Sequence, residues 1–227
     1  MLSRLDLMVI KPAVIVDAGC GTGELVMALA GRYPAAKVYA VDVSAEMLGS
    51  VMPSTSILCM QEDAGKLSLP DHSVDLLCAN FLLPWAADAN ACLSEWRRVL
   101  APNGLLMLSV LGTGTLQEIK TSLPPNSLPP LIDMHDLGDA LINAGFADPV
   151  MDTYDLKVHY RDGQRMQREL HASGLLSQIV TLPDAGLQVT FEVVHGHAFT
   201  PVPVAEFKSD ADGHVRIPLS HLRKSLP

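Results

Sequence analysis

The segment that most constrains the fold is VIVDAGCGTG, residues 14–23, where a short apolar run ends in an acid and continues through alternating glycines. Glycines at positions 19, 21 and 23 allow a sharp turn and a close approach of the backbone to a ligand at the start of a helix. The dinucleotide fingerprint G-x-G-x-x-G uses the same device, but here the third glycine comes one residue earlier and an acid precedes the loop. The pattern predicts a strand, a ligand-binding loop and a helix.

The first half of the chain continues this alternation of short apolar runs and helical patterns, which is typical of a parallel sheet with crossover helices. The predicted strands are residues 14–17, 37–42, 56–61, 74–80 and 105–111. The predicted helices are residues 23–32, 45–52 and 86–100, and Pro102, Asn103 and Gly104 predict a turn before the fifth strand.

The second half has a different pattern. Residues 122–130 (SLPPNSLPP) predict a surface loop, and Asp133 predicts the N-cap of a helix that runs to about residue 143. Residues 150–160 and 187–197 alternate like strands and complete a seven-stranded sheet as antiparallel edge partners, with a short helix at 161–173 between them. We expect one domain over 1–200, with its core at 12–111 and a substrate-side region at 112–200, and a polar tail at 201–227.

Composition narrows the class of partner. The 227 residues carry a net charge of −9 with 48% hydrophobic residues, and no apolar stretch reaches the roughly 18 to 20 residues of a membrane span. We expect a soluble cytoplasmic protein with no membrane partner, and the negative charge disfavours nucleic acid. The cysteines at 20, 59, 78 and 92 form no C-x-x-C pair, so reduced core thiols are expected and no metal. The oligomeric state stays open.

Three acids follow three successive predicted strands. Asp42 comes 19 residues after Gly23, where a carboxylate can accept hydrogen bonds from both hydroxyls of a ribose. Asp63 is placed to accept from the exocyclic amine of adenine, and Asp17 suits an ammonium group. For any one acid a helix cap or a solvated turn is the simpler role. Together, in register with the glycines, they predict a site for S-adenosylmethionine.

With DAGCGTG at 17–23, YAVD at 39–42 and EDA at 62–64, the chain resembles the class I S-adenosylmethionine-dependent methyltransferases. The segments LPDHSVDLLCANFLLPW at 69–85, ACLSEWRRVLAPNGLLMLSVLGTGTLQEI at 91–119, DMHDLGDALINAGFADPVMD at 133–152 and LQVTFEVVHGHAF at 187–199 are similar to the BioC family. That family methylates the free carboxyl of malonyl-acyl carrier protein on the way to biotin. A complex I assembly factor that hydroxylates an arginine shares the scaffold.

The resemblance implies a Rossmann-like class I methyltransferase fold, with a mostly parallel seven-stranded sheet and helices on both faces. It implies S-adenosylmethionine as the cofactor and malonyl-acyl carrier protein as the partner. The implied cofactor residues are Asp17, Gly19, Cys20, Gly21, Gly23, Asp42, Val43, Met47, Asp63, Ala64 and Asn80. Residues 80–85 would line the reaction centre, where Phe81 and Trp85 position the reactants and, with Leu83, form an apolar wall.

Methyl transfer to a carboxylate needs no general base, because a carboxyl with a pKa near 4 is already ionised at neutral pH. We therefore expect no catalytic His or Glu. Alignment of acceptor oxygen, methyl carbon and sulfur, together with exclusion of water, would be the task of the protein.

Cations are expected at the substrate side. Arg161, Arg165 and Arg168 fall on one face of the predicted helix at i, i+4 and i+7, and could meet the substrate carboxylate or the acidic surface of a carrier protein. A solvated helix face is the simpler alternative. His195 and His197 share a strand face, but two imidazoles without a third ligand do not predict a metal.

His135, in the first turn of a predicted helix, could cap that helix, contact solvent or contact substrate. Two other functions stay open at this point. The scaffold could serve hydroxylation, as in the complex I assembly relative, or it could be a degenerate methyltransferase fold that acts as a binding or assembly protein.

Overall fold

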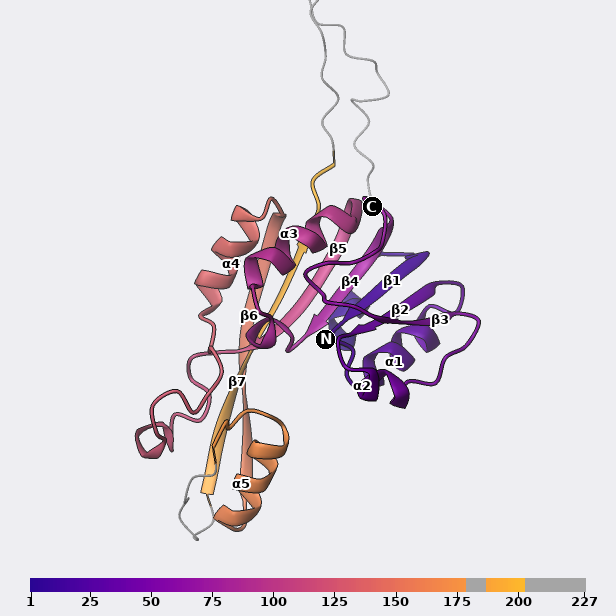
Figure 1. Cartoon of the computed structure of the whole chain (residues 1–227). Helices are drawn as coiled ribbons and strands as arrows, with labels where there is room; N and C mark the ends of the chain where they lie inside the picture. The colour runs from indigo at the N-terminus through magenta and orange to yellow at the C-terminus, as the bar shows by residue number, and fades with distance from the viewer. Residues whose placement is uncertain (179–186, 203–227) are drawn as a thin grey trace, which may run out of the picture.

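The computed structural model describes residues 1–178 and 187–202, which form a sheet of seven strands in the order β3-β2-β1-β4-β5-β7-β6 (Figure 1). The strands are β1 (Val14–Ala18), β2 (Lys37–Asp42), β3 (Ile57–Gln61), β4 (Val74–Asn80), β5 (Leu100–Leu111), β6 (Ala147–Tyr160) and β7 (Leu187–Phe199). The helices are α1 (Glu24–Arg32), α2 (Ala45–Ser50), α3 (Ala89–Val99), α4 (Met134–Asn143) and α5 (Gly163–Ala172). Short 3₁₀ turns are η1 (Leu2–Leu7), η2 (Leu83–Trp85) and η3 (Lys120–Ser122).

The strand order brings the predicted motifs to one edge of the sheet. Strands β1 to β5 are parallel, and β1 lies between β2 and β4. The chain therefore passes from β1 to β2 on one side and later returns to the other side of β1 as β4. The loops that follow β1 and β4 lead in opposite directions, which leaves a crevice between them. Ligands of doubly wound sheets bind at this switch point. The mostly parallel, seven-stranded α/β fold confirms the prediction.

Helices cover both faces of the sheet, because each helix has one apolar stripe. On one face, Val26 and Leu29 of α1 pack with the fully buried Leu5 of η1 against β1, β2 and β4. On the other face, the fully buried Trp96 of α3 and Leu141 of α4 pack against the opposite side chains of the same strands. The inner strands β1, β2 and β4 are thus apolar on both sides, as buried parallel strands require.

The far halves of β6 and β7 extend beyond this core and carry α5 at their end, away from α1 and α2 (Figure 1). We call residues 154–178 and 187–193 the arm. The arm has an apolar cluster of its own, in which Met166 and Leu170 of α5 pack with Leu175 and Leu176. This packing fixes α5 on the strands.

Several predicted details were wrong. Strand β7 is not an edge strand: it pairs antiparallel with β5 on one side and β6 on the other, so β6 alone forms that edge. The predicted turn at residues 102–104 is an irregularity inside β5, where Asn103 has φ +61°. Cys59 is exposed rather than a core thiol. The predicted tail lies outside the described residues from position 203 onward.

Candidate active site

The glycine loop after β1 is shaped by its contact with the segment after β4. Gly19 has φ +69°, a conformation that residues with a Cβ rarely adopt, and a Cβ there would lie 2.6 Å from Cδ1 of Leu82. Gly21 has φ +53°, and a Cβ at Gly21 would meet no atom within 4 Å. Gly19 therefore permits close packing of the two loops, whereas Gly21 faces open space.

Asp42, at the end of β2, ties the loop to the start of the next helix. Its Oδ2 accepts a hydrogen bond from the Gly21 backbone N–H, and its Oδ1 accepts one from the Ser44 N–H, each at 2.9 Å. Ser44 in turn caps α2 by accepting from the Met47 N–H at 3.2 Å. Both carboxylate oxygens keep further lone pairs for a ligand.

Helix α3 packs against the segment after β3 and holds it in place. The buried Trp96 indole N–H donates to the Ala64 carbonyl at 3.0 Å, and Oδ1 of Asp63 accepts from the Gly65 N–H at 2.7 Å. Cys92 of α3 lies under the same segment, where burial raises the pKa of its thiol to about 11. The thiol is therefore protonated at neutral pH and is not a nucleophile.

The segment after β4 turns sharply. The Asn80 side-chain oxygen accepts from the Ser109 hydroxyl at 2.7 Å, and the Phe81 N–H donates to the Ser109 Oγ at 3.2 Å. Phe81 has φ +57°, which is uncommon outside glycine, so the network holds a strained residue at the strand end. Trp85 is 52% exposed, whereas Leu83 is buried in the core, so Leu82 replaces Leu83 in the predicted apolar wall.

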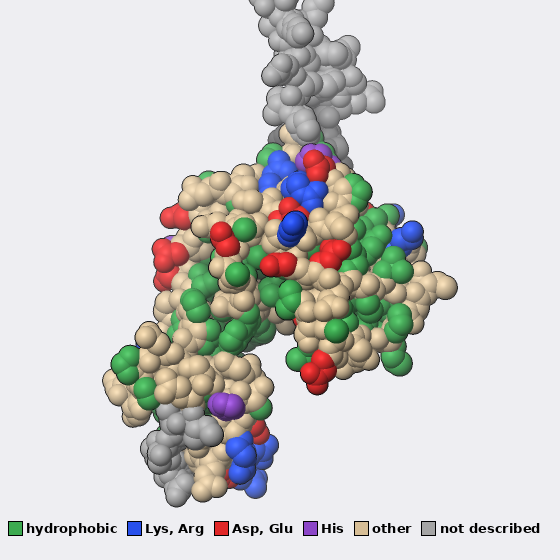
Figure 2. All heavy atoms as spheres, in the orientation of Figure 1, with side chains coloured by type: hydrophobic (Ala, Val, Ile, Leu, Met, Phe, Trp, Pro, Cys, Tyr) green, Lys and Arg blue, Asp and Glu red, His purple; other side chains and the backbone are tan. Residues whose placement is uncertain are grey.

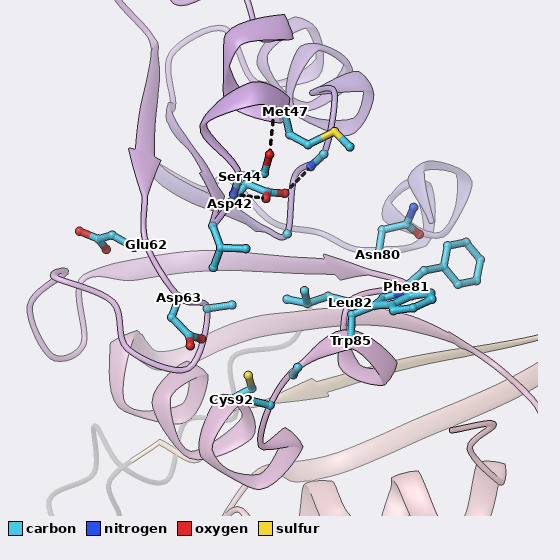
Figure 3. Close-up of a pocket in the computed structure, with 16 residues that line it drawn as sticks. Asp42, Ser44, Met47, Glu62, Asp63, Asn80, Phe81, Leu82, Trp85 and Cys92 are labelled. Carbon is cyan, nitrogen blue, oxygen red and sulfur yellow. Dashed lines mark hydrogen bonds between the residues drawn. The ribbon is translucent and has the colours of Figure 1, made fainter. Parts of the chain in front are cut away.

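These segments enclose a cavity of about 610 Å³, within the usual range for small-molecule sites (Figure 3). Ten of the predicted site residues line it: Gly19, Gly21, Asp42, Val43, Met47, Asp63, Ala64, Asn80, Phe81 and Trp85. Leu82, which falls in the range 80–85 expected at the reaction centre, also lines it, as do residues that were not predicted: Ser44, Glu62, Ala86, Ala87 and Cys92. Each lies within a few positions of a predicted residue except Cys92, for which nothing in the sequence of α3 indicated a place at the cavity.

Three predicted cofactor residues do not line the cavity. Asp17 is 1% exposed, and within the described residues neither carboxyl oxygen has a hydrogen-bond partner. Burial, with a smaller effect from Asp42, raises the pKa of Asp17 to about 8. Cys20 is buried, and a Cβ at Gly23 would touch Val51 of the core instead of the cavity. The three acids therefore do not share one cavity as expected; Asp42 and Asp63 do.

The arginines lie outside the cavity. Helix α5 begins at Gly163 with Asp162 as its N-cap, so Arg161 precedes the helix, and the expectation that it shares a helix face with Arg165 and Arg168 was wrong. All three are exposed on the arm. The helix begins two residues later than predicted because the Asp162 carboxylate accepts from the Arg165 backbone N–H and caps the helix at that point.

The histidines of interest also lie apart from the cavity. His195 is buried and stacks on Tyr154 with 5.6 Å between ring centroids, and burial lowers its pKa to about 4. His135 is exposed beside the α4 N-cap Asp133, whose carboxylate accepts from the His135 N–H. In residues 1–178 and 187–202 no group of three or more His, Cys, Asp or Glu could hold a metal ion. No helix in those ranges is both long and apolar enough to span a bilayer.

The cavity fits a nucleoside carrying a polar chain. Asp42 offers paired acceptor oxygens beside the exposed apolar side chains of Val43 and Met47, which suit a ribose and the flat face of a base. Asp63 lies farther along the wall, and Phe81 and Trp85 lie at the other end (Figure 3). Open space at Gly21 lets a ligand approach the loop backbone.

Comparison with known proteins gives a consistent result. Residues 16–108 match the family model described as a methyltransferase domain. A malonyl-[acyl-carrier protein] O-methyltransferase from Methylovorus is 34% identical, over 88% of this chain and 80% of the relative. A protein of the same name from Gallionella capsiferriformans is 35% identical, over 89% of this chain and 82% of the relative.

Solved structures agree at the level of the fold. The YcgJ protein of Bacillus matches with a TM-score of 0.65 and 15% identity, over 89% of this chain and all of that chain (100%). A Haemonchus contortus phosphoethanolamine N-methyltransferase, solved with S-adenosylhomocysteine, matches with a TM-score of 0.63 and 15% identity, over 88% of this chain and 51% of that chain.

Proposed function

We propose, because this chain belongs to the malonyl-[acyl-carrier protein] O-methyltransferase family, that it transfers a methyl group from S-adenosylmethionine to the free carboxyl of malonyl-acyl carrier protein. The reaction would be an early step of biotin synthesis in the cytoplasm. The observation that carries the proposal is the cavity at the switch point, which has acceptor carboxylates along one wall and an apolar wall after β4. It suits a charged nucleoside on one side and an acyl chain on the other.

The proposed cofactor residues are those that line the cavity. Asp42 would accept from the ribose hydroxyls while it holds Gly21 in place, and Asp63 would accept from the adenine amine. Val43 and Met47 would pack against the base. The other predicted cofactor residues, Asp17, Cys20 and Gly23, do not line the cavity. They would contribute indirectly, by shaping the loop that does. S-adenosylmethionine, when bound, supplies an electrophilic methyl group on a sulfonium.

The reaction places few demands on proton transfer. The malonyl carboxyl is already ionised at neutral pH and attacks with an oxygen lone pair, so no proton has to leave the acceptor. The titratable side chains that line the cavity in the described part of the chain are Asp42, Glu62, Asp63 and Cys92. The transfer needs none of them as a base, and the Cys92 thiol is protonated.

Phe81 and Trp85 would instead orient the reactants. Both lie at the cavity end after β4, and the Ser109 network fixes the backbone at Phe81. Their rings would displace water that otherwise solvates the acceptor carboxylate. Holding acceptor oxygen, methyl carbon and sulfur in line can contribute roughly 7 to 11 kcal/mol in favourable cases.

The proposal is tested by incubating the protein with methyl-labelled S-adenosylmethionine and malonyl-acyl carrier protein, then treating the product with mild base. We expect label on the carrier that base releases as methanol, since base cleaves the methyl ester as well as the thioester that holds the acyl group. Acetyl-acyl carrier protein, which has no free carboxyl, is the matched control. Label that stays after base, or label on the acetyl carrier, would refute carboxyl methylation.

A further inference from the structure

The arm carries a cationic surface on a chain that is otherwise strongly negative. Lys157, Arg161, Arg165 and Arg168 lie within one short stretch that begins in β6 and ends in α5, while the whole chain has a net charge of −9. Figure 2 shows Lys and Arg side chains gathered over α5 at the free end of the arm, beside the hollow that separates the arm from the body. The arm also holds Asp155, Asp162, Glu169 and Glu192, so it is neutral as a whole, and its positive charge is local to the exposed side of α5.

The packing of α5 decides which way this surface faces. Met166 and Leu170 are buried against the arm's apolar cluster, so Arg165 and Arg168 lie on the opposite, exposed side. None of the arginines on the arm lines the cavity. Of the two roles considered for these arginines, direct contact with the reacting carboxylate is therefore disfavoured, and contact with a partner protein is favoured.

Two of the acids near α5 are already engaged, whereas the exposed Asp155 on β6 forms no ion pair in the described part of the chain. Asp162 caps α5, and Glu169 pairs with Arg165, with 2.8 Å between Nε and Oε1. Within residues 1–178 and 187–202, Arg161 and Arg168 take part in no ion pair. Their positive charge is thus available to an incoming anionic group.

The end of α5 also touches the cavity wall. Gly174, in the turn after α5, has φ +75°, and a Cβ there would lie 3.3 Å from the Trp85 ring. Trp85 lines the cavity and is half exposed. A partner that rests on the exposed face of α5 would therefore sit next to the Trp85 end of the site.

We infer that the exposed face of α5, with Arg161 and Arg168, which form no ion pair among the described residues, is the docking surface for the acidic acyl carrier protein. The inference rests on the proposed function for the identity of the partner. A chain of net charge −9 repels an acidic protein at long range, so productive encounter needs a local positive surface beside the site. Docked there, the carrier would present its thioester-linked acyl chain toward Trp85.

The test measures binding of holo-acyl carrier protein without an acyl group, so that it does not depend on methyl transfer. Variants Arg161→Glu, Arg168→Glu and the double variant are compared with Lys37→Glu, which makes the same charge change as each single variant on an exposed residue at the start of β2. We expect the double variant to raise the Kd for the carrier about tenfold or more, and the wild-type Kd to rise with added salt. Lys37→Glu should shift the Kd less than twofold.

Methylation is then measured on malonyl-acyl carrier protein and on malonyl-pantetheine, which lacks the protein. We expect the ratio of kcat/KM for the carrier to that for pantetheine to fall about tenfold in the double variant. Unchanged carrier binding and an unchanged ratio in a folded double variant would overturn the docking surface while the proposed function stands. Arginine-dependent carrier binding without methylation of either substrate by the wild type would refute the proposed function and leave the docking surface in place.

Discussion

The Asp42 carboxylate accepts a hydrogen bond from the Gly21 backbone N–H at 2.9 Å, which joins the end of β2 to the loop after β1. The same carboxylate accepts from the Ser44 N–H, so two of its lone pairs organise the protein itself. Gly21 and Asp42 line the cavity together, and the remaining lone pairs of the carboxylate can accept from a ligand there. A change at Asp42 should therefore disturb both the loop and the ligand.

Asp42→Asn should weaken binding of S-adenosylmethionine roughly 10- to 100-fold, because an amide has one acceptor oxygen and no charge to offer the ribose hydroxyls. Isothermal titration measures this Kd directly. Asp75→Asn is the matched control, since Asp75 also accepts from two backbone N–H groups, those of Ala13 and Val14, at the start of β1 and away from the cavity. Equal losses of affinity in both variants would mean that Asp42 acts through stability alone.

Asp17 should make the free energy of unfolding depend on pH. Its pKa is about 8 in the folded state and 3.8 in the unfolded chain, so the folded state binds the extra proton between these values. Stability should therefore be highest near or below pH 4 for this group and fall as pH rises toward 8, by at most about 1.4 kcal/mol per pH unit. Urea unfolding from pH 5 to 8 should give a flatter dependence for Asp17→Asn, and parallel slopes would contradict this account.

Substitution of Trp85 should affect mainly catalysis, whereas substitution of Trp96 should affect mainly stability. Trp85→Ala should lower kcat/KM for malonyl-acyl carrier protein roughly 10- to 100-fold with little change in Tm, since the half-exposed ring borders the cavity and contributes to alignment. Trp96→Ala should lower stability by about 3 to 5 kcal/mol, because that ring is fully buried and bonds to Ala64. A Trp85 variant that loses stability but keeps its kcat/KM would reverse these roles.

The rate should not depend on pH near neutrality. With an acceptor that is ionised above about pH 5, kcat/KM should be constant between about pH 6 and 8, where the protein remains folded. Initial rates at saturating S-adenosylmethionine and low malonyl-acyl carrier protein give this profile. A sigmoidal rise centred near pH 6.5 to 7 would indicate a required base that titrates in the range typical of histidine, which is not among the described residues that line the cavity.

Much of this arrangement could be predicted from local patterns. The apolar runs and helical periodicities gave the chain order of strands and helices, and parallel connectivity then placed Gly21, Asp42 and Asp63 at one edge of the sheet. Such predictions succeed because each depends on a few consecutive residues and on a general rule of chain topology.

The features that were missed depend on contacts between distant parts of the chain. Nothing local distinguishes Asp17, which is buried, from Asp42, which borders the cavity, because both end apolar strands. Leu82 and Leu83 are adjacent where η2 begins, and the sequence does not indicate that Leu82 lines the cavity while Leu83 is buried. The burial of Leu5 likewise follows from packing of η1 on a sheet assembled from later segments.

The most direct test of the central claim is the intact mass of the carrier after reaction with S-adenosylmethionine. A mixture of malonyl- and acetyl-acyl carrier protein should give malonyl carrier heavier by one methylene and acetyl carrier unchanged, with S-adenosylhomocysteine formed in equal amount. Unmodified malonyl carrier under conditions where the protein binds S-adenosylmethionine would contradict the assignment of malonyl carboxyl methylation.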